Sequence, residues 1–323
     1  SYTETSLIRH EESKKSRHIA LRSLLKRSGT SIQELKPCFM MSPMSVAQYC
    51  QPGQFDFDIV IMDEASQIRP EEALGSVARG NSLVVVGDPK QLPPTSFFDK
   101  LVQNEDDDDV VALQESESIL DSVIPIFRNR RLRWHYRSRH EELISFSNKH
   151  FYDSNLIIFP SPIQESTDLG VRYFYVEKGR YQSSRNVEEA QVLINSLSEQ
   201  VKRNPNETVG VVAMNSQQQA ELDMHLDQKL KDDPEFSAAY ELINSGETIF
   251  VKNLENVQGD ERDVIFISMT YGPEKVGGNV FQRFGPINSS VGWRRLNVLF
   301  TRSKKKMCVF SSMRSSHIKG HLY

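Results

Sequence analysis

Five short, almost wholly apolar segments are the feature that most restricts how this chain can fold. They are rich in Val, Ile, Met and Phe, helical or polar stretches separate them, and they lie at Ile59–Met62, Leu83–Val86, Val209–Met214, Val264–Met269 and Met307–Phe310. Strands of a parallel sheet have this composition because helices cover both of its faces. No apolar run approaches the roughly 20 residues of a membrane-spanning helix. We therefore expect an α/β protein without a membrane partner.

Amphipathic helices are predicted between several of these segments. Pro70, followed by two glutamates, is expected to begin one helix, and Gly80 is expected to end it. A second helix is expected over residues 186–204, where apolar residues recur at helical spacing. The S-x-x-E spacing of Ser138 and Glu141 predicts a capping box at the start of a third.

A change in charge marks a predicted domain boundary. Residues 105–109 are five consecutive acids, which cannot pack in a core and should form a solvated loop. The chain before residue 128 carries a formal net charge of −8, and the remainder carries +4. We therefore predict two domains, residues 1–125 and residues 126–323.

The cysteines bear on the cellular compartment. Cys38, Cys50 and Cys308 are too few and too scattered for a disulfide framework. They also lack the paired C-x-x-C spacing of a zinc site. We expect buried, reduced thiols in a cytoplasmic protein.

Polar residues follow the first two apolar segments. Ligands bind beyond the carboxyl ends of parallel strands, so Asp63 and Glu64 could both act on a bound ligand, each in a different role. One would hold a hydrated Mg²⁺, and the other would orient or deprotonate an attacking water. A solvated strand end is the alternative interpretation of two acids alone. The second segment ends in GDPKQLPP, where Gln91 can donate to a phosphate oxygen and accept from a water, which indicates a sensor of the same site.

An arginine-rich stretch follows the predicted boundary. Six arginines occur among residues 128–139, interleaved with Trp134, His135 and Tyr136. They could grip a nucleic-acid backbone while the rings stack on bases, or one could reach a transferring phosphoryl group. A solvated helix face with a packed Trp–Tyr pair is the alternative for most of them. We do not apply this alternative to Arg137, which lies just before the predicted capping box.

Two further polar segments occur in the second predicted domain. One is VQGDE at Val257–Glu261, and the other is RRLNVLFTR at Arg294–Arg302. On a helix, the apolar residues of the latter form a buried stripe, while Arg295 and Arg302 share another face. Such arginines usually face solvent, yet Arg302 precedes three lysines that strengthen the positive field around it.

In this order, the segments resemble motifs II to VI of superfamily 1 helicases, in the branch of the nonsense-mediated-decay helicase. The matching segments are DEASQ from Asp63, GDPKQLPP from Gly87, YRS from Tyr136, VQG with Glu261, and RRLNV from Arg294 with Thr301-Arg302. The similarity spans roughly residues 36–313, and several motifs in register weigh far more than one. Within the branch, the chain most resembles large bacterial helicase-related proteins that carry KPCFMMSP, here Lys36–Pro43, ahead of motif II.

The resemblance implies a fold and an activity. The fold is a pair of RecA-like parallel sheets: an incomplete first domain with motifs II and III, and a complete second domain with motifs IV to VI. The activity is that of an ATP-dependent helicase or translocase on single-stranded DNA or RNA. ATP and Mg²⁺ are the implied cofactors.

The resemblance also implies roles for residues of the first domain. Asp63 would bind Mg²⁺, and Glu64 would activate the water. Gln91 would contact the γ-phosphate. Gly87 and Asp88 belong to the same nucleotide-binding motif.

The resemblance also implies roles for charged residues of the second domain. Arg137 and Arg302 would stabilise the transition state, and Glu261 would touch the nucleotide or couple it to the strand. Gly259 belongs to the same motif as Glu261. Much looser matches place three residues near positions that face nucleic acid: Ser42 in the first domain, and Asn215 and Gln218 in the second.

The sequence departs from the family at one point. The phosphate-binding loop G-x-x-x-x-G-K-[ST] is absent, because none of the 16 glycines is followed by Lys. Without that loop there is no cradle for the β-phosphate, no phosphate lysine and no hydroxyl ligand for the metal. The later motifs keep their reactive side chains, so we expect a fragment that begins after the loop rather than a degenerate ATPase. Its partner would be the missing N-terminal part of the same protein, and alone it would hydrolyse ATP negligibly.

Two alternatives stay open at this point. A non-catalytic nucleic-acid-binding or scaffold module could have kept the fold and lost the ATPase activity. A different P-loop phosphatase or a transporter ATPase is the other, although arginines in a second domain of the same chain weigh against it. A phosphate-binding loop upstream would favour the motor over the scaffold.

Overall fold

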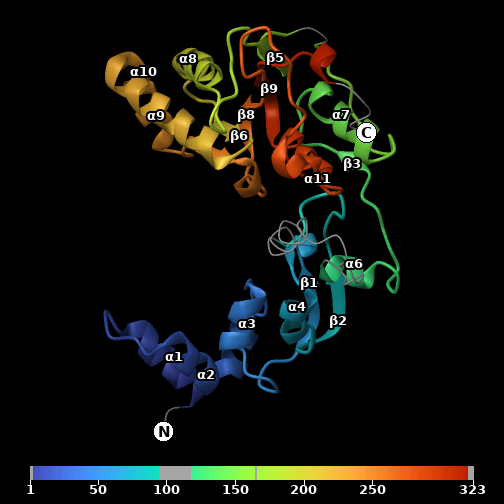
Figure 1. Cartoon of the computed structure of the whole chain (residues 1–323). Helices are drawn as coiled ribbons and strands as arrows, with labels where there is room; N and C mark the ends of the chain where they lie inside the picture. The colour runs from blue at the N-terminus through green and yellow to red at the C-terminus, as the bar shows by residue number, and fades with distance from the viewer. Residues whose placement is uncertain (1–2, 95–117, 164–165, 319–323) are drawn as a thin grey trace. The chain divides into compact units, whose positions relative to one another are not determined.

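The structure is a computed structural model that describes residues 3–94, 118–163 and 166–318. The chain forms two compact units, Ser1–Arg130 and Arg131–Tyr323 (Figure 1). The acidic run at residues 105–109 lies outside the described residues. The domain assignment from the motifs, with its boundary after residue 125, stays a prediction.

In its described residues, 3–94 and 118–130, the first unit is mostly helical and contains one pair of strands. Its elements are α1 (Glu4–Ser13), α2 (Leu21–Leu35), α3 (Pro43–Tyr49), β1 (Phe57–Met62), the 3-10 turn η1 (Ala65–Gln67), α4 (Pro70–Val77), β2 (Gly80–Val85) and α6 (Ile119–Val123). Strands β1 and β2 pair in parallel, with Met62 opposite Val85. Both predicted strands are confirmed, and β2 begins before the apolar run at residue 83.

Helix α4 shows how the local sequence sets an element and where that inference fails. Pro70 occupies its first turn, as predicted, because a proline there forfeits no helical hydrogen bond. The expectation that Gly80 ends the helix is wrong: Gly80 is the first residue of β2. A Cβ at Gly80 would stand 2.6 Å from Cγ2 of Val60, so the close strand pairing accounts for the glycine.

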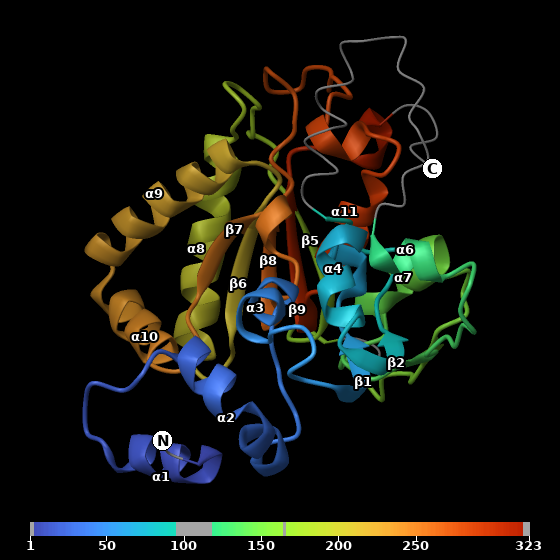
Figure 2. The same ribbon diagram turned by 90° about the horizontal axis from the view of Figure 1, so that it is seen from below.

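The second unit is built on a parallel sheet with the strand order β5-β9-β8-β6-β7, which can be followed in Figure 2. Its elements are β3 (Trp134–His135), α7 (Glu142–Phe151), β4 (Ile157–Ile158), β5 (Gly170–Tyr175), α8 (Val187–Arg203), β6 (Val209–Ala213), α9 (Ser216–Asp232), α10 (Pro234–Asn244), β7 (Phe250–Asn253), η2 (Leu254–Asn256), β8 (Arg262–Ser268), η3 (Gly285–Asn288), α11 (Trp293–Phe300), β9 (Ser303–Ser311) and η4 (Ser315–His317). The predicted α/β class with parallel sheets is confirmed.

Helices cover both faces of this sheet, which explains its apolar strands. Helices α8, α9 and α10 lie on one side, and α7 and α11 lie on the other (Figure 1). The core on the α8 side includes fully buried Leu193 and Leu197 of α8, packed with Val211, Phe266 and Phe310 of the strands. Alternate residues of these strands serve this core, and their neighbours face the other helices.

The predicted helix over residues 186–204 is confirmed as α8, whose N-cap is Asn186. The Oδ1 of Asn186 accepts a hydrogen bond from the backbone N of Glu189 at 3.2 Å. The predicted capping box at Ser138 is wrong, because α7 begins at Glu142. Ser138 instead pairs with the ring of His135, whose Nε2 lies 2.8 Å from its hydroxyl oxygen.

The remaining expectations on thiols and membranes have mixed outcomes. Cys50 and Cys308 are buried free thiols, as expected, but Cys38 is exposed, so that expectation is wrong for it. Burial raises the pKa of Cys308 to about 11, which keeps this thiol protonated. Within the described ranges, no helix is both long enough and apolar enough to cross a membrane.

Candidate functional site

In the first unit, Asp63 and Glu64 stand at the carboxyl end of β1. Both are exposed, and Glu64 adopts a left-handed conformation with φ 50° that turns the chain into η1. Such a conformation costs a non-glycine residue roughly 1 kcal/mol, so the surrounding contacts must hold it. One of them is the 2.9 Å hydrogen bond from the N of Ala65 to the carbonyl of Val86, which ties the ends of β1 and β2 together.

The segment after β2 lies against this turn. A Cβ on Gly87 would stand 3.1 Å from the backbone N of Ala65, so only a glycine lets the two strand ends approach this closely. Asp88 then accepts a hydrogen bond from Nε2 of Gln91 at 3.3 Å. The structure therefore brings the candidate residues that follow β1 and β2 to one edge of this strand pair: Asp63, Glu64, Gly87, Asp88 and Gln91.

The donor set at this edge fits a substrate-bound Mg²⁺ rather than a protein cage. Among residues 3–94, 118–163 and 166–318, no group of three or more His, Cys, Asp or Glu side chains could hold a metal ion. Mg²⁺ usually takes only one or two protein carboxylates and completes its shell with water and phosphate oxygens. The exposed carboxylate of Asp63 could supply such a single ligand.

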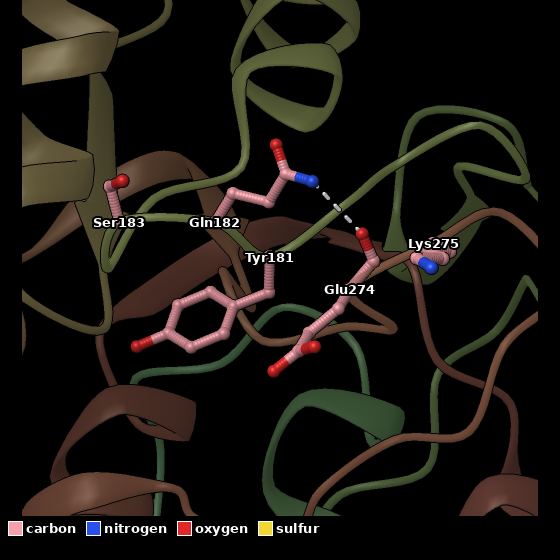
Figure 3. A pocket seen from close by; sticks show the side chains of 5 residues that line it. All are labelled: Tyr181, Gln182, Ser183, Glu274 and Lys275. Carbon is pink, nitrogen blue, oxygen red and sulfur yellow. Dashed lines mark hydrogen bonds between the residues drawn. The ribbon is translucent and has the colours of Figure 1, made fainter.

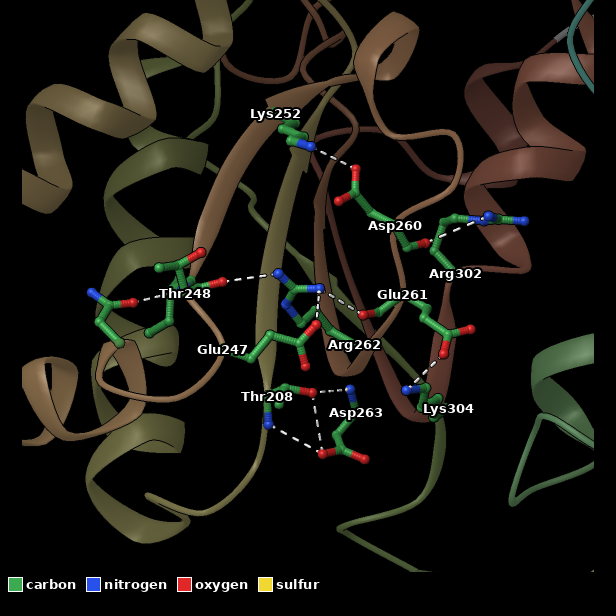
Figure 4. A network of polar contacts seen from close by, with 12 residues as sticks. Thr208, Glu247, Thr248, Lys252, Asp260, Glu261, Arg262, Asp263, Arg302 and Lys304 are labelled. Atoms are coloured by element: carbon green, nitrogen blue, oxygen red, sulfur yellow. Dashed lines mark hydrogen bonds and ion pairs between the residues drawn. The ribbon is translucent and has the colours of Figure 1, made fainter. Parts of the chain in front are cut away.

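In the second unit, charged residues gather where the strands of the five-stranded sheet begin (Figure 4). Glu261, directly before β8, lies 3.0 Å from Nε of Arg137 through Oε2 and 2.8 Å from Nζ of Lys304 through Oε1. The hydrogen bond from Lys304, together with the charges of Arg137 and Arg302, lowers the pKa of the Glu261 carboxyl below its usual value. Two residues predicted to act on the nucleotide, Arg137 and Glu261, are thus direct partners.

Arg302 is the next residue of this cluster, and it is only 4% exposed. Its Nε donates to the carbonyl of Val298 at 2.8 Å, and one terminal nitrogen donates to Oγ1 of Thr301 at 2.9 Å. The other terminal nitrogen donates to the carbonyl of Asp260 at 3.5 Å (Figure 4). A cation is favoured there because the last carbonyls of α11 carry partial negative charge. The guanidinium is therefore fixed beside the segment that leads into Glu261.

The expectation that Arg295 and Arg302 share one face of a helix is wrong, and so is the alternative that both face solvent. Helix α11 ends at Phe300, so Arg302 lies beyond it. Arg295 is 2% exposed, and its Nε pairs with Oε1 of Glu255 at 2.6 Å. Both arginines fasten the loops around α11.

Gly259 makes the turn that precedes Glu261. Its φ is +86°, and a Cβ there would meet no atom within 4 Å. The backbone conformation alone therefore accounts for the glycine. The turn closes with a 3.2 Å hydrogen bond from the N of Asp260 to the carbonyl of Val257.

The arginine-rich stretch carries its rings on the surface. Tyr136 is 89% exposed and Trp134 is 62% exposed. Trp134 packs on Phe159 with ring centroids 5.3 Å apart. The alternative of a packed Trp–Tyr pair is therefore wrong.

The residues predicted to face nucleic acid have unequal exposure. Asn215 follows β6 and caps α9, where its Oδ1 accepts from the backbone N of Gln218 at 2.8 Å. Ser42 is exposed and caps α3 in the first unit. Gln218 is fully buried, and its amide bonds to the backbone of Asn186 and the hydroxyl of Ser268. The side chain of Gln218 therefore presents no surface to a ligand, whereas contacts through Ser42 and Asn215 stay predictions.

Sequence reasoning missed a buried carboxylate at the same end of the sheet. Glu189 is fully buried and accepts four hydrogen bonds: its Oε1 from the hydroxyl of Ser268 and the N of Thr270, both at 2.7 Å, and its Oε2 from the hydroxyl of Ser312 at 3.0 Å and Nδ2 of Asn186 at 3.4 Å. Burial outweighs these bonds and raises its pKa to about 7. The only signal in the sequence was its place in an acidic first helical turn, which is commonplace.

A pocket of about 360 Å³ lies at this end as well, between the loop before α8 and the loop after β8 (Figure 3). It is lined by Tyr181, Gln182, Ser183, Glu274 and Lys275. The Nε2 of Gln182 donates to the carbonyl of Glu274 at 3.0 Å and joins the two loops (Figure 3). None of these residues was predicted to act, and their mixed charges favour no ligand class.

The candidate groups of the second unit thus divide between two edges of one sheet. Glu261 and Arg302 directly precede β8 and β9, at the amino edge. Asn215 and the Glu189 network follow the strands, at the carboxyl edge. A strand rises about 3.3 Å per residue, so the seven residues of β8 separate the edges by roughly 20 Å. This sheet can therefore present two ligands to two different surfaces.

Comparisons with known proteins agree with the motifs. A family model described as an AAA domain matches residues 116–314, and a second model with that description matches residues 44–98. Over 306 residues the chain is 30% identical to the uncharacterized ATP-dependent helicase MG140 of Mycoplasma genitalium, covering 90% of this chain and 26% of that protein. A homolog in Mycoplasma pneumoniae is 30% identical over 310 residues, covering 91% and 26%. Helicase sen1 of Schizosaccharomyces pombe is 26% identical over 281 residues, covering 81% and 15%. The chain spans about a quarter or less of the length of these relatives.

Proposed function

The chain belongs to the AAA-domain family as a superfamily 1 helicase-like protein, and from that premise we propose that it is part of an ATP-dependent motor that moves along single-stranded nucleic acid. One observation carries the proposal. At the amino edge of the five-stranded sheet, Arg137 and Lys304 pair with Glu261, and the charge of the buried Arg302 acts on the same carboxylate. Such a concentration of cations suits the charge that develops during phosphoryl transfer.

The first unit would supply the groups that act on metal and water. ATP with Mg²⁺, when bound, would supply the phosphoryl group and the charge that holds it in place. Asp63 would take one coordination position, and the exposed Glu64 would orient the attacking water and accept its proton. Gln91, anchored on Asp88, would contact the terminal phosphate.

The second unit would supply fixed positive charge. Arg302 needs no further ordering, because three hydrogen bonds already hold its guanidinium. Arg137 is more exposed and can turn toward a phosphate. Positioning of this kind accounts for nearly all catalysis in phosphoryl transfer.

The nucleic acid, DNA or RNA, would meet the opposite edge of the sheet, where Asn215 follows β6. The net charge of this half of the chain is modest, so binding to single strands should weaken steeply as salt rises. The 323 residues alone, which lack a phosphate-binding loop, would hydrolyse ATP negligibly.

The test is steady-state phosphate release by the full-length protein with Mg²⁺ and a single-stranded oligonucleotide. Glu64→Gln should lower the rate by about 10²–10⁴, the usual worth of a general base. Glu71→Gln is the matched control: it removes a carboxylate of the same unit, on α4, whose side chain is 68% exposed, and should leave the rate unchanged. Equal rates in the wild-type protein and Glu64→Gln would contradict the proposed function.

A further inference from the structure

Glu261 stands between two cations, Arg137 and Lys304. Its Oε2 lies 3.0 Å from Nε of Arg137, and its Oε1 lies 2.8 Å from Nζ of Lys304. The carbonyl of Lys304 also accepts a hydrogen bond from the N of Arg139 at 2.7 Å. The start of β9 therefore holds both the carboxylate that pairs with Arg137 and the backbone next to Arg137.

Arg137 approaches this carboxylate most closely through Nε, on the side of its guanidinium. Within the described parts of the chain, its two terminal nitrogens make no hydrogen bond, and its side chain is 42% exposed. Those nitrogens form a planar pair of donors that matches two oxygens of a phosphate. Glu261 thus pairs with Arg137 and leaves these donors unoccupied.

A carboxylate paired with a single guanidinium tends to engage it with both oxygens. In Glu261, Oε1 lies 2.8 Å from Nζ of Lys304. The other oxygen, Oε2, is the one that approaches Arg137 most closely. Lys304 therefore divides the carboxylate between two cations.

The other charges near Glu261 have partners elsewhere. Arg302 is near enough to lower its pKa, but the nitrogens of Arg302 donate to backbone carbonyls and to Thr301. Asp260 pairs with Lys252 at 2.6 Å (Figure 4). Lys304 is the cation that sets the direction of this carboxylate.

We propose that Lys304 is a positioning residue: by holding one oxygen of Glu261, it keeps the terminal nitrogens of Arg137 open for a phosphate. The proposal rests on the proposed function, because it takes Arg137 as a phosphate ligand. Without Lys304, Glu261 would turn onto Arg137 with both oxygens and compete with the phosphate.

The test is a double-mutant cycle in the full-length protein, with the affinity for the β,γ-imido analogue of ATP and Mg²⁺ as the measurement. Lys304→Ala should weaken the affinity about tenfold, because Glu261 is then free to compete. In a Glu261→Gln background the same change should alter the affinity by less than about twofold, since a neutral amide does not compete. Lys304→Arg should keep most of the affinity, because an arginine can also hold one oxygen of Glu261.

Lys305→Ala is the matched control. It removes the same charge from the next residue of β9, whose partners are Glu207 at 3.2 Å and Asp263 at 3.5 Å. We expect nearly wild-type affinity. Equal losses from the two lysine variants would overturn the proposal, because the effect would then be one of overall charge.

Two further outcomes separate this proposal from the function on which it rests. A loss from Lys304→Ala that persists in the Glu261→Gln background would overturn the positioning role alone, since Lys304 would then act on the nucleotide directly. An unchanged affinity in Arg137→Ala would overturn the assignment of Arg137, and with it both proposals.

Discussion

The two edges of the five-stranded sheet hold charge in different ways. At the amino edge, Arg137, Glu261 and Lys304 form ion pairs in which 32–42% of each side chain is exposed. At the carboxyl edge, Glu189 is completely buried and is surrounded by hydrogen-bond donors from two strand ends and a helix cap.

This difference separates a surface that can exchange partners from one that cannot. An exposed ion pair is worth about 0–1 kcal/mol, so an incoming phosphate can replace a carboxylate at little cost. A buried polar group that loses its partner costs about 1–3 kcal/mol. We infer that the amino edge is suited to a ligand that binds and leaves, and that the carboxyl edge forms a rigid frame.

The largest effect that we expect at the amino edge is the loss of ATP hydrolysis when Arg302 is removed. In the full-length protein, Arg302→Ala should slow ATP hydrolysis by about 10³–10⁵, the worth of a transition-state arginine in related reactions. Lysine should rescue poorly, because a point charge cannot reproduce a two-pronged contact. Phosphate release and oligonucleotide affinity are measured on the same variants, and affinity should stay nearly intact. An unchanged rate with altered salt dependence of binding would make Arg302 a nucleic-acid contact instead.

At the other edge, the largest expected effect is on stability. Glu189→Ala leaves several buried donors without an acceptor and should lower the free energy of unfolding by about 3–5 kcal/mol, as measured by urea denaturation. The neighbouring Glu188 pairs with Arg180 and is partly exposed, so Glu188→Ala should cost less than about 1 kcal/mol. Similar losses from both variants would mean that the carboxyl edge is no more rigid than the amino edge.

The pKa of Glu189 predicts a dependence on pH. Burial raises it from 4.5 to about 7, so the folded state binds this proton more tightly than the unfolded state does. The resulting stabilisation is fully present below about pH 4.5 and is lost as the pH rises through 7, by up to about 3 kcal/mol in total. Urea denaturation between pH 4.5 and 8 should show this decline in the wild-type protein and a flatter profile in Glu189→Gln. Parallel profiles would assign the decline to other groups.

The smallest expected effect is the loss of stability when either of two glycines is replaced by alanine. Gly259 leads to the amino edge, and Gly277 lies in the loop after β8; both have positive φ, and a Cβ at either would meet no atom within 4 Å. Alanine at each should therefore cost about 1 kcal/mol of stability, from backbone strain alone. Only Gly259→Ala should also weaken the binding of an ATP analogue in the full-length protein. Weakening by both variants would show that the binding effect follows from lost stability.

What the sequence could predict was local. The apolar runs placed β6, β8 and β9 because the strands of a covered sheet carry few polar residues. Helix α8 followed from its periodicity and from the cap at Asn186. The capping box at Ser138 failed because the ring of His135, three residues earlier, takes that hydroxyl.

The candidate site depended on contacts that no local pattern records. The motifs named Arg137 and Glu261, but only the fold shows that they are partners. The resemblance placed Gln218 near nucleic acid, yet its amide is bonded to the backbone of Asn186 and the hydroxyl of Ser268. Glu189 and Lys304 were indistinguishable from ordinary charged residues until the strands brought their partners together.

Hydrogen–deuterium exchange on the full-length protein tests the separation of the two edges most directly. The protein is measured alone, with the β,γ-imido analogue of ATP and Mg²⁺, and with a single-stranded oligonucleotide. We predict that the nucleotide analogue protects peptides that cover Val257–Glu261 and residues 301–304, and that the oligonucleotide protects peptides that cover residues 214–218. Protection of the amino-edge peptides by the oligonucleotide, with the carboxyl-edge peptides unchanged, would contradict the account.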